Sequence, residues 1–89
     1  MQLRGKQVAA ARELLGLSQA ELAEAAGIAR ITLARFEAGM AEPMRGSIEK
    51  IQAELERRGI EFTNGTGLGV RLDFAKAEAA ARTEGRSER

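Results

Sequence analysis

Two arginines and an isoleucine stand close together in the stretch 27–39, at Arg30, Ile31 and Arg35. Successive residues of a helix advance by about 100°, so these three side chains would share one side of it. A guanidinium can donate two hydrogen bonds to guanine O6 and N7, and an aliphatic side chain can contact a thymine methyl group. This set of side chains suits contact with base edges rather than bond-making chemistry.

The 89-residue chain contains no cysteine and no histidine. Thiol nucleophiles, imidazole bases, disulfides and Cys/His zinc sites are therefore excluded. A chain this short rarely encloses a catalytic cleft, so we expect neither an enzyme nor a cofactor. Fourteen Lys and Arg residues against thirteen Asp and Glu give a formal net charge of +1, so any nucleic-acid role depends on where the arginines lie.

Four stretches show apolar residues at the spacing of an amphipathic helix, and a glycine follows each of them. Ser18 and Glu21 fit the capping box that starts a helix, since each side chain can satisfy a backbone N–H of the first turn. The predicted helices span about 3–15, 18–26, 30–38 and 45–58.

From residue 60 the pattern alternates with a period of two, as it does in half-buried strands. The expected strands are 60–63 and 70–74, and the glycine-rich stretch 64–69 suits a hairpin or a longer reversal. The alanine-rich segment 75–82 predicts a helix, and the polar residues 83–89 predict a frayed end.

Two short helices joined by a glycine-containing turn, over 18–38, form a helix-turn-helix unit. The major groove of DNA is about 12 Å wide and admits one helix, which the preceding helix braces across the backbone. Arg30, Ile31 and Arg35 would then face the bases. The alternatives are a solvated face for the arginines and a protein partner for Ile31.

The runs 14–23 and 27–39 resemble the Cro/C1-type (XRE) helix-turn-helix family of bacterial and phage transcriptional regulators. The resemblance covers roughly residues 3–58 and rests on S-Q-x-E-L-A followed by two glycines twelve positions apart. It implies a mainly α fold, in which a four-helix, lambda-repressor-like DNA-binding domain over 1–59 precedes a β-hairpin or strand pair and a helical or frayed tail over 60–89.

The resemblance also implies residue roles. An internal ion pair would join Arg12 to Glu37, and Glu37 also lies beside the apolar side of its predicted helix, where it needs a partner. The implied base contacts are Arg30, Ile31 and Arg35, and the implied phosphate contacts are Gln19, at the start of the second helix, and Thr32.

The chain departs from the family pattern in two places. Ala29 stands where the family often has a Ser or Thr cap, and losing a cap costs about 1 kcal/mol. The loop after Gly39 is usually basic but here reads Met-Ala-Glu-Pro-Met, so Arg45 is the nearest substitute for a phosphate contact. Arg4 and Lys6 are either an arm that touches phosphates or an ordinary charged terminus.

The predicted strands carry apolar side chains that a small domain cannot leave bare. They can pack on the helical core of their own chain or pair with the strands of a second chain. We favour the second arrangement, because an isolated hairpin is marginally stable and a two-fold dimer would place two recognition helices about 34 Å apart. The expected interface residues are Ile60, Phe62, Val70, Leu72 and Phe74.

We therefore expect a sequence-specific regulator that binds double-stranded DNA, a repressor acting as a homodimer on a palindromic operator. The alternative is the antitoxin half of a toxin–antitoxin pair, in which the C-terminal segment binds a protein partner and the helix-turn-helix unit binds DNA for autoregulation. Three Phe without Trp or Tyr offer few stacking platforms, which disfavours a single-strand or RNA binder. No run in MQLRGKQVAAAR suits a signal peptide or membrane span, so we expect a cytoplasmic protein.

Overall fold

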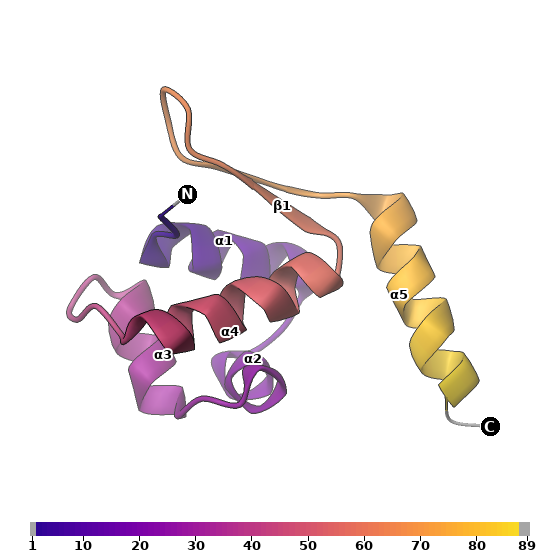
Figure 1. The fold of residues 1–89 in the computed structure, drawn as a ribbon, viewed down its shortest axis with the longest axis horizontal. Helices are drawn as coiled ribbons and strands as arrows, with labels where there is room; N and C mark the ends of the chain where they lie inside the picture. The colour runs from indigo at the N-terminus through magenta and orange to yellow at the C-terminus, as the bar shows by residue number, and fades with distance from the viewer. Residues whose placement is uncertain (1, 88–89) are drawn as a thin grey trace.

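The computed structural model describes residues 2–87, with side chains as far as Arg82. A bundle of four helices is followed by a two-stranded antiparallel hairpin and a fifth helix that stands apart from the bundle (Figure 1). The elements are α1 (Gly5–Leu15), α2 (Gln19–Ala26), α3 (Arg30–Glu37), α4 (Arg45–Arg57), β1 (Ile60–Thr63), β2 (Gly69–Leu72) and α5 (Phe74–Ser87). The expected mainly α fold with a C-terminal hairpin is confirmed.

Local signals place the ends of the helices. The Ser18 hydroxyl accepts the Glu21 backbone N–H at 3.0 Å, and the Glu21 carboxylate accepts the Ser18 backbone N–H at 2.8 Å, which forms the predicted capping box at the start of α2. Gly27 ends α2 with a φ of 74°, in the left-handed region that glycine enters without a Cβ clash.

The core lies where α1, α2, α3 and α4 meet. The first turn of α1 comes close to the end of α3, because a Cβ on Gly5 would lie only 1.9 Å from the Phe36 carbonyl oxygen. Only glycine permits this backbone approach, which fixes α1 against α3. The buried apolar residues are Leu3, Val8, Ala11, Leu22, Ala23, Leu33, Phe36, Ile51, Leu55 and Ile60.

The hairpin pairs its two strands with each other and lays its apolar face on the helices of its own chain. Ile60 pairs with Leu72, and Phe62 pairs with Val70, so these four side chains share one face. Ile60 is 2% exposed and belongs to the core, while the other three are half-buried against it. The four side chains thus pack on the helices of their own chain, which is the first of the two predicted arrangements and not the favoured pairing with the strands of a second chain.

A buried glutamine fastens the hairpin to α1 at the end where the turn begins. The Gln7 side chain is almost fully buried, and its Oε1 accepts the backbone N–H of Arg4 at 3.0 Å. Its Nε2 lies within hydrogen-bond distance of the Thr63 carbonyl at 3.2 Å, the Asn64 Oδ1 at 3.1 Å and the Gly69 carbonyl at 3.1 Å. The alternating pattern that predicted the strands did not predict these hydrogen bonds from Gln7.

The second strand ends earlier than predicted. β2 stops at Leu72, and Phe74 is the first residue of α5, where it is 79% exposed rather than part of the strand. The Asp73 carboxylate accepts the Lys76 backbone N–H at 2.9 Å and so caps α5. The helix runs to Ser87, beyond its expected end at residue 82, and residues 88 and 89 of the predicted frayed end lie outside the described residues.

Across the described residues, none of the helices combines the length and the apolar character needed to span a membrane.

Candidate nucleic-acid interface

The helix α3 presents the predicted arginines and isoleucine to solvent. Arg30, Ile31 and Arg35 are all exposed, and Ile31 is 58% exposed although it is apolar. Leu33 and Phe36 on the other side of α3 are buried in the core. One helix therefore holds a fixed inner face and an outer face of two guanidiniums and an aliphatic side chain, as the periodicity predicted.

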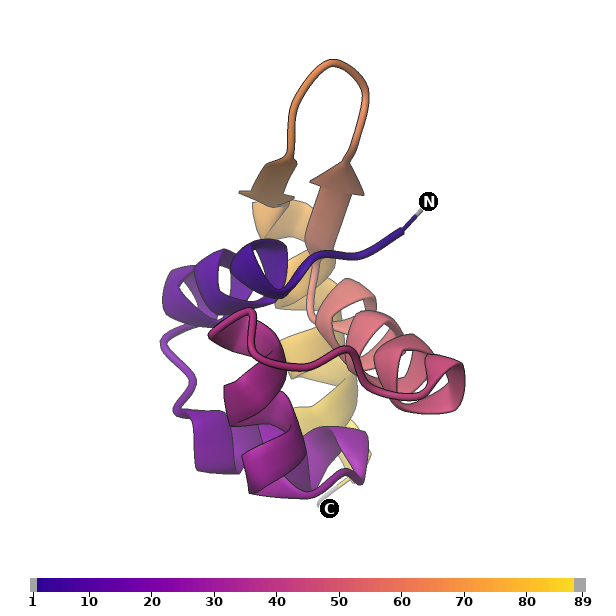
Figure 2. The same cartoon turned by 90° about the vertical axis from the view of Figure 1, so that its left-hand side faces the viewer.

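The helices α2 and α3 form the helix-turn-helix unit. The turn closes at Gly27, and the backbone N–H of Ile28 donates to the Ala23 carbonyl at 3.0 Å. Ala29 occupies the cap position of α3 without a side-chain hydrogen bond, as its apolar side chain requires. Figure 2 looks onto the side of the molecule that carries α3, the loop after it and the first turn of α1, with α5 behind.

A buried ion pair holds the end of α3 against α1. Arg12 Nε and Nη2 each donate to the Glu37 carboxylate at 3.0 Å, and Arg12 Nη1 donates to the Leu17 carbonyl at 2.9 Å. The side chains of Arg12 and Glu37 are 15% and 5% exposed. The hydrogen bonds to Glu37 raise the pKa of the Arg12 guanidinium above its usual range, so this guanidinium stays protonated.

Gln19 joins this ion pair, which sequence reasoning missed. Its Nε2 donates to Glu37 Oε1 at 3.0 Å, so one donor of the predicted phosphate contact is already committed inside the protein. The neighbouring Glu21 carboxylate accepts the Ser18 N–H, and the hydrogen bonds from Ser18 lower the pKa of Glu21 below its usual range. A phosphate at the start of α2 would therefore meet a nearby negative charge and the remaining N–H of Gln19.

The other two predicted phosphate contacts occupy different settings. Thr32 is half-buried on α3, close to the exposed arginines in sequence. Arg45 is exposed at the start of α4 and lies 3.6 Å from the Glu49 carboxylate, one turn along the same helix. Met40 and Met44, in the loop between α3 and α4, are both exposed, so neither fills the core.

Several cations of α4, β2 and α5 form ion pairs, whereas in the part of the chain that the structure describes Arg30 and Arg35 of α3 form none. Within the described part of the chain, no carboxylate lies within ion-pair distance of Arg30 or Arg35. Unpaired guanidiniums keep their donors available for a ligand. The paired residues are Arg57 and Arg58 with Glu54, Arg71 and Lys76 with Glu61, and Arg82 with Glu78.

A family model described as Helix-turn-helix matches residues 8–61, which is more than half of the chain. The matched segment runs from within α1 to the start of β1 and contains α2 and α3 whole. The comparison with curated proteins gave no match. The chain therefore belongs to the Cro/C1-type (XRE) helix-turn-helix family, whose function is that of a DNA-binding transcription regulator.

Proposed function

We propose that the protein is a sequence-specific repressor that reads double-stranded DNA with α3. The single observation that carries the proposal is the exposed, unpaired face of Arg30, Ile31 and Arg35 on a helix whose other face is locked into the core. Specificity would come from these side chains, and affinity from contacts to phosphates. Bound at a promoter, the domain would repress transcription by occupying the site.

Selection of bound duplexes from a random library tests this proposal. The selected sites should share one motif, and Arg30→Ala or Arg35→Ala should each lose about 1–3 kcal/mol of discrimination at one base position while weak non-specific binding survives. Arg82→Ala is the matched control, because it removes an exposed arginine from α5. Operator discrimination that survives both α3 substitutions would show that another surface reads the bases.

We also propose that the repressor binds a palindromic operator as a homodimer, joined through the C-terminal segment. Ile60 is buried in its own chain. Support for a dimer interface comes instead from Phe74, which is 79% exposed and follows the half-buried Leu72 by two residues. An aromatic side chain left in water on so small a protein favours an interface. Sedimentation at micromolar concentration should give a dimer for the natural chain and a monomer for Phe74→Glu; a monomeric natural chain would contradict the proposal.

The antitoxin alternative keeps one specific observation in its favour. The helix α5 stands apart from the bundle, with most of its described side chains exposed, so it is accessible to a different protein (Figure 1). Co-expression with the product of the adjacent gene separates the two functions. A stable complex that is lost when α5 is removed would support the antitoxin, and salt-dependent DNA binding without any partner would support the repressor alone.

A further inference from the structure

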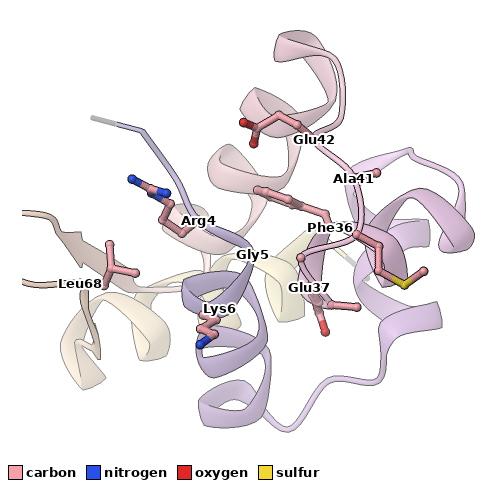
Figure 3. A pocket seen from close by; sticks show the side chains of 11 residues that line it. Arg4, Gly5, Lys6, Phe36, Glu37, Ala41, Glu42 and Leu68 are labelled. Carbon is pink, nitrogen blue, oxygen red and sulfur yellow. The ribbon is translucent and has the colours of Figure 1, made fainter.

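A cavity opens where the first turn of α1 meets the end of α3. It has a volume of about 420 Å³, is open to solvent, and is also lined by the loop after α3 and by Leu68 of the hairpin tip (Figure 3). Arg4 and Lys6 line it on either side of Gly5, and Phe36, Met40 and Leu68 supply its apolar lining. The proposed recognition residues do not line this cavity, so it is a separate feature of the same side of the molecule.

Positive charge predominates in this cavity. Arg4 and Lys6 are exposed, and no carboxylate in the described part of the chain pairs with either of them. Of the two carboxylates that line the cavity, Glu37 is neutralised by its two hydrogen bonds from Arg12. Glu42 is exposed and accepts only a long hydrogen bond, 3.5 Å, from Gln2. Two cations therefore face one uncompensated carboxylate.

The cavity lies at the C-terminal end of α3, the helix proposed to read the bases. Arg30 and Arg35 are five residues apart, so they are separated by about 7.5 Å along α3. Gly5 packs directly on the carbonyl of Phe36, the residue after Arg35, at the C-terminal end of the same helix, which places its neighbours Arg4 and Lys6 just beyond that end. Figure 2 shows this first turn of α1 and α3 on one side of the molecule, with α5 on the far side.

We propose that Arg4 and Lys6 bind a backbone phosphate of the DNA at the C-terminal end of α3. The inference rests on the proposed DNA-reading role of α3. Duplex DNA carries one negative charge per about 1.7 Å of its axis, so a helix in the groove meets phosphates beyond its ends. The loop after α3 contributes Glu42, which repels a phosphate, and the first turn of α1 supplies the cations that this loop lacks.

Salt dependence of binding to a duplex of random sequence tests the proposal. The double variant Arg4→Gln/Lys6→Gln keeps two polar side chains but removes both charges. It should reduce the slope of log affinity against log salt by about one unit if the two cations share a phosphate, and by about two if each holds its own. Arg82→Gln removes an exposed charge from α5 and should leave the slope unchanged. Thermal melting of each variant verifies that it is folded.

Ethylation interference on the selected operator identifies the phosphate. Ethylating one phosphate at the end of α3 should weaken binding of the natural protein but not of the double variant. An unchanged slope or an unchanged interference pattern in the double variant would overturn the inference, as would a shift in base preference, since a phosphate contact carries no base information. These results leave the proposed function intact, whereas a natural protein that fails to bind any duplex would overturn the proposed function itself.

Discussion

Replacing Glu37 with glutamine tests how the recognition helix is held. Glu37 accepts hydrogen bonds from Arg12 Nε and Nη2 and from Gln19 Nε2, each at 3.0 Å. Glutamine keeps the shape but loses the charge, and its amide group turns a donor toward a guanidinium that only donates. Breaking a buried ion pair costs about 3–5 kcal/mol. Arg12 retains the Leu17 carbonyl at 2.9 Å, so we expect the lower end, about 3 kcal/mol.

Chemical denaturation followed by circular dichroism measures this loss. For a domain of this size about 3 kcal/mol corresponds to a fall in Tm of about 12–24 °C. The double variant Arg12→Met/Glu37→Leu removes both charges and should cost less than Glu37→Gln alone, because no charge is left buried without a partner. Glu24→Gln, on the exposed side of α2, is the control. If Glu37→Gln stayed within about 0.5 kcal/mol of the natural protein, the ion pair would not be what holds α3.

Two further predictions concern the fold. Gly5→Ala should destabilise the protein by about 1–3 kcal/mol or more, because its Cβ would lie 1.9 Å from the Phe36 carbonyl oxygen. Gly46→Ala, in α4 with nothing within 4 Å of the added Cβ, should stabilise it by about 0.5–1 kcal/mol; thermal melts giving both substitutions the same sign would contradict this reasoning. The hydrogen bonds from Ser18 lower the pKa of Glu21, so this carboxylate stabilises the fold above its unfolded pKa and loses that contribution as the pH falls through its folded pKa. With no histidine in the chain, the free energy of unfolding should be flat between about pH 6 and pH 7 and fall below about pH 4.5, and urea titrations showing a step near neutrality would refute this assignment.

The parts of the fold that depend on neighbours in sequence were predictable. The helix α2 starts at Ser18 because Glu21 can reach back to it, and both residues are visible in the sequence. The exposed face of α3 follows from the helical period, since buried Leu33 and Phe36 leave Arg30 and Arg35 outside. Those signals act within a turn or two, so no knowledge of distant contacts was needed.

The parts that depend on distant contacts were not predictable in the same way. The alternating pattern showed that the strand containing Phe62 has an apolar face. It did not show whether that face is covered by the same chain or by a second one. Phe74 continued the alternating pattern, yet the Asp73 cap starts a helix there and turns the aromatic ring to solvent. A weak signal existed for Gln7, which lies four residues before buried Ala11 and so on the inner stripe of α1.

The helix α5 is attached to the rest of the chain near its first turn, so its far end lies at a distance from the attachment point. Its first turn is tied to the bundle by the Asp73 backbone N–H, which donates to the Gly59 carbonyl at 2.8 Å, and by the close packing of Ala77 on Gly59. The helix contains 14 residues and is therefore about 21 Å long. A rotation of about 10° at this junction sweeps its tip through about 4 Å. A fluorescent label near that tip would thus amplify any small change of angle at Gly59 into a displacement large enough to measure.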